Sequence, residues 1–141
     1  MFTKKAVSLF ASILVLLSVS SPAFAVGPVQ SPQSAPIHLF YVYINSASSS
    51  LSISNGTATV NGYVQRTSSG KKITLESTLQ QYSKGYWHAV KSWSVSSTSY
   101  SASISKNYGV SSGTYRVATY YSVSGASGTE SDTVYSRTVT C

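Results

Sequence analysis

Cysteine is almost absent: the chain of 141 residues has one, Cys141, so no disulfide can form within it. Small exported domains often depend on disulfides, and without them this chain must rely on its apolar core. We expect Cys141 to carry a free thiol on a frayed end, with a disulfide-linked dimer through Cys141 as the alternative.

Acidic residues are also scarce, with three in the chain, and the net charge is +7. The basic residues beyond position 25 are dispersed, and only Lys71 and Lys72 are adjacent. A nucleic-acid surface shows clustered basic residues, so we expect no nucleic-acid partner. The dispersed charge fits attraction to cell-wall polysaccharide or another anionic surface, and it fits a plain role in solubility equally well.

Ligands and loops for a metal or cofactor are missing as well. His38 and His88 are the only histidines, and neither has another candidate ligand at the spacing of a zinc site. Neither the GxGxxG motif nor the P-loop motif occurs. We therefore expect no cofactor and no metal.

The longest apolar run lies at the N-terminus and predicts a signal peptide over residues 1–25. Lys4 and Lys5 precede the apolar stretch 6–19, and Ala23-Phe24-Ala25 supplies a small-x-small cleavage site. The run is shorter than the roughly 20 residues that span a bilayer. We expect cleavage after Ala25, secretion to the extracellular space, and no transmembrane segment in the mature chain.

The rest of the chain divides into a leader and one domain. Three prolines over 26–36 predict a disordered, extended leader. From 37 to 141, apolar and polar residues alternate with period two, the pattern of β-strands. In the segment 114–123 we expect Tyr115, Val117, Thr119, Tyr121 and Val123 on the core side and Arg116, Ala118 and Tyr120 outside. In the segment 73–79 we expect Ile73, Leu75 and Leu79 inside and Glu76 outside. We expect strands over 37–44, 58–64, 73–79, 86–95, 100–104, 114–123 and 133–140, a loop over 46–50, and turns at 55–56, 67–70, 83–85 and 125–128. The fold class is therefore all-β, an antiparallel sandwich of seven to eight strands.

The segment 111–117 resembles the start of strand F in immunoglobulin-like domains, where a tyrosine forms the tyrosine corner. Tyr115 matches that tyrosine, while Val117 stands where the cysteine would be, so fibronectin type III domains are the closer analogue. The resemblance implies that Tyr115 fills the core and that its hydroxyl bonds a backbone group within 107–112. It also implies that 114–123 neighbours 73–79, which would let Arg116 pair with Glu76.

Residues 51–139 resemble a family of small exported β-sandwich proteins of Gram-positive bacteria whose function is unassigned. The shared features are Leu79-Gln80, Gly85-Tyr86-Trp87, Val90, Trp93 and the segment 113–117, followed by a glycine-rich hairpin with Glu130-Ser131. These motifs imply a fold and no catalytic activity.

Three patterns suggest catalysis, and each has a simpler explanation. Residues 109–113 match the G-x-S-x-G elbow around Ser111, but a strand rather than a helix is expected after it. Residues 68–71 and 103–106 read S-x-x-K without the other β-lactamase motifs. Glu130 and Asp132 would share a strand face and suit a cation or a glycosidase pair, or they are solvated residues at a hairpin edge. We expect no enzymatic activity.

Aromatic residues are the best functional lead. We expect Trp87, Lys91 and Trp93 on one face of a strand. Because burial of a lysine is costly, that face should be partly exposed to solvent, unless a β-bulge changes the register. We hypothesise a ligand-binding surface that stacks on sugars or enters a lipid interface, formed by Tyr82, Tyr86, Trp87 and Trp93. Alternatively, one or both tryptophans fill the core.

Together these features predict a secreted, non-catalytic binding module for cell-wall glycan or an extracellular partner. The alternative is a bacteriocin-like or membrane-active secreted protein. Export, basic charge and aromatic content are also consistent with this alternative.

Overall fold

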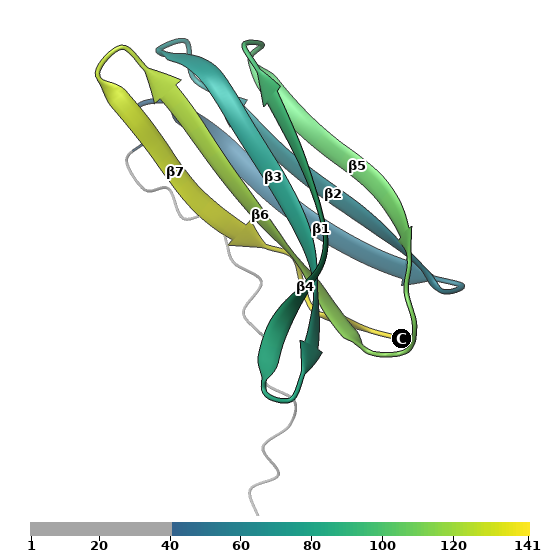
Figure 1. Ribbon diagram of the computed structural model, residues 1–141. Coiled ribbons are helices and arrows are strands. Elements are labelled where there is room, and N and C mark those ends of the chain that lie inside the picture. Colours follow the sequence, from purple (N-terminus) through teal and green to yellow (C-terminus); the bar gives the residue numbers. More distant parts are fainter. Residues whose placement is uncertain (1–40) are drawn as a thin grey trace, which may run out of the picture.

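The computed structural model describes residues 41–141 (Figure 1). These residues form eight strands and no helix. The strands are β1 (Ile44–Ser54), β2 (Thr57–Arg66), β3 (Gly70–Ser83), β4 (Tyr86–Ser97), β5 (Ser101–Gly109), β6 (Thr114–Gly125), β7 (Gly128–Tyr135) and β8 (Val139–Thr140). The predicted signal peptide, the leader over 26–36 and His38 lie outside the described residues.

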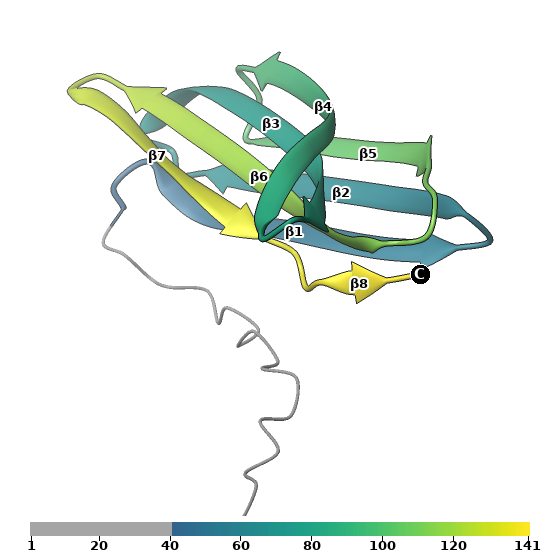
Figure 2. The same cartoon turned by 60° about the horizontal axis from the view of Figure 1, so that its bottom comes forward.

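The strands form two antiparallel sheets that lie face to face (Figure 2). The smaller sheet has the order β1-β2-β5, and the larger has the order β4-β3-β6-β7, with β8 paired to the start of β6. The predicted all-β class and the number of strands are confirmed. Among residues 41–141 there is no helix long and apolar enough to cross a membrane.

Two hairpins close with two-residue turns in the left-handed region of φ. Asn55 and Gly56 have φ angles of 49° and 72°, and Lys84 and Gly85 have φ angles of 53° and 84°. Turns of this kind match the right-handed twist of the flanking strands, and Asn-Gly is strongly preferred in them. The predicted turns at 55–56 and 83–85 are confirmed.

Two predicted boundaries near the start of the domain are wrong. The predicted loop over 46–50 is the middle of β1, where these residues pair with 61–65 of β2. The serine-rich composition of this segment is typical of a loop. The Ser49 hydroxyl, however, forms hydrogen bonds with Val117 and Thr119 of the facing sheet, so a serine is accommodated in the strand. The predicted strand over 37–44 is also wrong in its described part, because Tyr41–Tyr43 are not in a strand and β1 begins at Ile44.

The core contains two apolar clusters with a polar layer between them. One cluster comprises Ile44, Val64, Ile73, Leu75, Ala102, Ile104, Tyr121 and Val123, and the other comprises Leu51, Ala58, Val60, Leu79, Tyr115 and Val117. In the polar layer Ser77 and Thr119 are fully buried with their hydroxyl oxygens 3.0 Å apart. Thr119 donates onward to the Ser49 hydroxyl at 2.9 Å, so every hydroxyl of this layer has a partner.

Strands β3 and β6 are neighbours in one sheet, as predicted. The residues expected on the core side of β6 are all buried: Tyr115, Val117, Thr119, Tyr121 and Val123. The predicted pair of Arg116 and Glu76 is wrong, because the register places Gln80 opposite Arg116 and Tyr120 opposite Glu76. The observed pairing of β3 with β6 differs from the predicted one by four residues. Because this number is even, every side chain stays on its predicted face, so the alternation pattern alone could not predict the residue opposite Arg116.

Candidate functional site

A β-bulge in β4 separates the two tryptophans. Lys91 lies opposite Leu79 of β3 and Ala89 lies opposite Gln80, so Val90 has no partner across the pair. One extra residue inverts the alternation of side chains along the strand. The prediction that Trp87 and Trp93 share a face is therefore wrong, and the bulge that would change the register is present.

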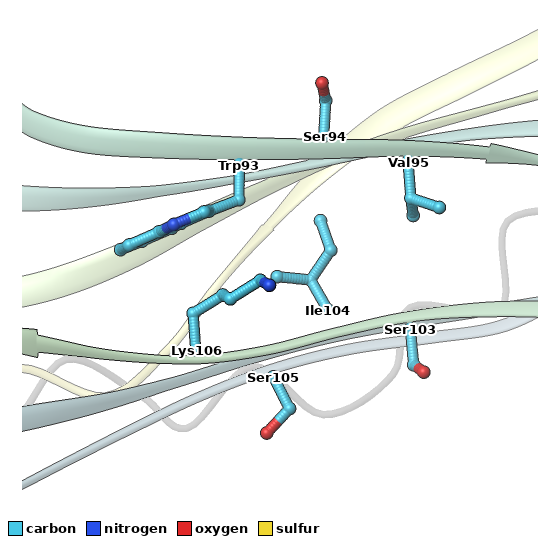
Figure 3. A pocket seen from close by; sticks show the side chains of 7 residues that line it. All are labelled: Trp93, Ser94, Val95, Ser103, Ile104, Ser105 and Lys106. Atoms are coloured by element: carbon cyan, nitrogen blue, oxygen red, sulfur yellow. The ribbon is translucent and has the colours of Figure 1, made fainter.

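Trp93 belongs to the interior side of β4 and packs against both apolar clusters. Its ring meets that of Tyr108 nearly edge-on, with the ring centroids 6.1 Å apart. It also lines a cleft of about 450 Å³ between the edge strands β4 and β5 (Figure 3). In that view Trp93 and Val95 point toward Ile104 and Lys106, whereas the three serines point away. Trp93 thus lies apart from the other aromatic candidates.

On the outer face of the larger sheet, Arg116 lies between two aromatic rings. Its guanidinium carbon is 4.3 Å from the ring centroid of Trp87 on β4 and 4.3 Å from that of Tyr135 on β7. Tyr82 on β3 lies beside Trp87, with the ring centroids 5.2 Å apart and the planes tilted by 57°. Four neighbouring strands therefore contribute to one surface, the Arg116 platform, which consists of Tyr82, Trp87, Arg116 and Tyr135.

The Arg116 platform is open to solvent. Tyr82 and Tyr135 are 48% and 46% exposed, while Trp87 and Arg116 are half-buried. Contiguous exposed aromatic surface on a small domain marks a site of interaction more often than scattered apolar residues do. Its rings and its charged group can bind a ligand that has both apolar faces and polar edges.

The two arginines that stack on aromatic rings use their N–H groups differently. Arg66 lies 4.3 Å from the centroid of the Tyr100 ring and donates to four backbone oxygens, those of Thr67, Gly70, Thr98 and Ser99. Arg116 donates through Nε alone, to Gln80 Oε1 at 2.8 Å, and within residues 41–141 its Nη1 and Nη2 have no protein acceptor. Arg66 therefore ties loops together, whereas Arg116 retains donors for a ligand.

The structure brings together two of the four aromatic residues that the sequence suggested, Tyr82 and Trp87. Tyr86 is 71% exposed at the hairpin between β3 and β4, where its ring lies 6.5 Å from that of His88 and belongs to the opposite strand face from Trp87. Sequence reasoning missed Arg116 and Tyr135 as members of the site. Alternation along the strand did place Arg116 on the outer face of the sheet. The position of Tyr135 near Arg116 depends on the register between β6 and β7, which places Tyr135 opposite Ala118.

Glu130 and Asp132, the candidate cation or glycosidase pair, hold the segment that precedes β1. The Glu130 carboxylate accepts the backbone N–H groups of Val42 and Tyr43, each at 2.7 Å. Asp132 accepts the Tyr41 hydroxyl at 2.9 Å. Both carboxylates are thus engaged in fixing residues 41–43 against β7, which is a structural use for the pair.

The contact between Tyr41 and Asp132 predicts a measurable titration. Desolvation and the Asp132 carboxylate raise the pKa of Tyr41 from 10.0 to about 12, because both disfavour the phenolate. The contact therefore stabilises the folded protein below pH 10, and this contribution is lost as the pH rises from 10 toward 12. NMR of ¹³Cζ-labelled tyrosine should show the pKa of Tyr41 falling in Asp132→Asn and unchanged in Glu76→Gln. An unchanged pKa in Asp132→Asn would contradict the contact.

The remaining sequence motifs have structural surroundings. Ser111 lies in the loop before β6, and its backbone oxygen accepts the Tyr115 hydroxyl at 2.9 Å. A strand follows it, so the strand–turn–helix geometry of a nucleophile elbow is not formed there. His88 lies with Nε2 at 3.1 Å from the Ser83 backbone oxygen. Residues 41–141 contain no group of three or more His, Cys, Asp or Glu side chains placed to hold a metal.

Cys141 is not frayed, in contrast to the expectation from sequence. Its backbone N–H and oxygen both bond Gly113 at 3.0 Å, and its Sγ donates to the Ser111 oxygen at 3.3 Å. The thiol is free and exposed. A disulfide-linked dimer stays a prediction.

Comparisons with known proteins leave the family of this chain open. No protein-family model matches it, and no curated protein matches it. Among solved structures, the sporulation control protein Spo0M from Bacillus subtilis is similar over 67% of this chain, with 10% sequence identity and a TM-score of 0.27. The chain spans half of that protein, with 50% of it covered, and a likeness this weak carries no argument about function.

Proposed function

We propose that this protein is a secreted, non-catalytic binding module that recognises cell-wall glycan through the Arg116 platform. The observation that carries the proposal is the partly exposed surface that three aromatic rings form with Arg116. Aromatic rings stack on the apolar faces of sugar rings, and a few placed polar groups fix the orientation of such a ligand. Neighbouring strands hold the rings in place, which lowers the entropy that is lost on binding.

The fold supports the same proposal. The pairing of β3 with β6 and the tyrosine corner at the start of β6 favour an immunoglobulin-like sandwich of the fibronectin type III kind. Membership of the family of small exported proteins of Gram-positive bacteria is part of the proposal, as is export through the signal peptide. An exported domain would carry its exposed platform directly to the polymers of the cell surface.

Binding to isolated bacterial cell walls tests the proposal. Trp87→Ala removes the ring that contacts both Tyr82 and Arg116, and we expect the affinity to fall about three- to tenfold, as for an aromatic contact. The matched control is Tyr86→Ala, which removes an exposed aromatic ring one residue away on the opposite strand face. Sedimentation of the walls with the protein gives both dissociation constants, and equal values for Trp87→Ala and the parent protein would refute the site.

A vesicle assay addresses the alternative, a bacteriocin-like or membrane-active protein. The proposal expects no dye release from anionic vesicles at concentrations that saturate the cell walls. Release that disappears at high salt would favour the membrane-active alternative, because screening weakens attraction between exposed charges.

A further inference from the structure

Arg116 has two N–H-bearing nitrogens that no protein acceptor within residues 41–141 occupies. The rings of Trp87 and Tyr135 flank its guanidinium group, and each ring centroid lies 4.3 Å from the guanidinium carbon. The Nε edge is occupied by Gln80, which accepts at 2.8 Å and so fixes the rotation of the plane. What remains is the edge that carries Nη1 and Nη2, two parallel donors without an acceptor among residues 41–141.

The geometry points to a carboxylate as the group that this edge binds, and we infer that the glycan recognised by the platform is a carboxylated one. This inference rests on the proposed function and names the chemistry of its ligand. Two parallel N–H donors match the two oxygens of a carboxylate, and a charge-assisted pair of this kind is stronger than bonds to neutral hydroxyls. The flanking rings partly shield the pair from water, which strengthens it further.

The surrounding charges leave this edge without an internal competitor. On β7, Glu130 and Asp132 lie opposite the core-side residues Val123 and Tyr121, so both belong to the face away from Tyr135. Glu76 shares the outer face but lies four residues along β3 from Gln80, about 13 Å away. The three acidic side chains of the protein are thus either turned away or too distant to pair with Arg116.

A phosphate group could also bind an arginine, so the experiment separates the two anions on one polymer. Isolated bacterial cell walls are used untreated, after amidation of their carboxylates with carbodiimide and methylamine, or after removal of phosphodiesters with hydrofluoric acid. We expect amidation to weaken binding about tenfold or more, as loss of hydrogen bonds to a charged group does. Removal of phosphodiesters should leave the affinity unchanged.

Variants assign the effect to Arg116. Arg116→Lys retains the charge but loses the parallel donors, so it should bind untreated walls about tenfold more weakly and respond little to amidation. Lys72→Gln removes a charge from the exposed end of the same sheet face and should behave as the parent. Equal thermal midpoints of the variants and the parent would show that folding is unaffected.

The possible results separate the carboxylate inference, the role of Arg116 and the proposed function. Binding that survives amidation, or that is lost with the phosphodiesters, overturns the carboxylate inference but leaves binding to the cell wall in place. Wild-type behaviour of Arg116→Lys overturns the role of Arg116. If none of the three wall preparations binds the parent protein, the proposed function fails and the inference fails with it.

Discussion

Tyr115→Ala is expected to lower the free energy of unfolding by about 3–5 kcal/mol, a large fraction of the roughly 5–15 kcal/mol that stabilises a folded domain. Tyr115 is 2% exposed and belongs to the apolar cluster at the β8 end of the sandwich. Its hydroxyl donates to the Ser111 backbone oxygen at 2.9 Å, which fixes the loop that leads into β6. The substitution therefore opens a cavity and also releases that loop.

Two further variants separate the ring from the hydroxyl. Tyr115→Phe keeps the ring and loses the bond to Ser111, so the expected cost is about 0.5–1.5 kcal/mol. Tyr120→Ala, on the outer face of the same strand, is the control and should change stability by about 0.5 kcal/mol or less. Urea unfolding followed by tryptophan fluorescence measures all three. A Tyr115→Ala protein as stable as the parent would refute the tyrosine corner.

Tyr115 shows what local sequence can predict. Its burial follows from alternation along β6. The resemblance to strand F of immunoglobulin-like domains implied a bond from its hydroxyl to a backbone group within 107–112, and the acceptor is the Ser111 oxygen. The buried positions Ile73, Leu75 and Leu79 of β3 followed from the same alternation. These features can be read from one strand at a time, because the hydrophobic effect is non-directional and buries the apolar face of a strand whichever strand it pairs with.

Features that join distant strands could not be predicted in this way. The Arg116 platform requires the bulge at Val90 and the registers of three strand pairs, and no residue pattern specifies any of them. The role of Glu130 depends on backbone N–H groups 87 and 88 residues away along the chain. Two of the four residues of the candidate site, Tyr82 and Trp87, were therefore predicted from the sequence. Arg116 and Tyr135 could be assigned to the site only from the structure.

The polar layer of the core gives the second large expected effect, at Gly62 of β2. A Cβ atom at this position would overlap the Ser77 hydroxyl and would lie 3.0 Å from Thr119 Cγ2. Gly62 thus lets the smaller sheet approach the buried hydroxyls of the larger one. Gly62→Ala should cost about 1–3 kcal/mol, because overpacking a filled core displaces its neighbours.

A double variant tests whether overlap with the Ser77 hydroxyl causes the destabilisation of Gly62→Ala. Ser77→Ala alone should destabilise the protein by about 0.5–1.5 kcal/mol, since it removes the donor to Thr119 in a buried layer. In the Gly62→Ala background the same change removes the overlapping hydroxyl, while Thr119 keeps its bond to Ser49. Ser77→Ala is therefore expected to stabilise Gly62→Ala, with a coupling energy of about 0.5–3 kcal/mol for residues in contact. Urea unfolding of the four proteins measures this coupling, and additive effects would show that Gly62 and Ser77 do not meet across the sandwich.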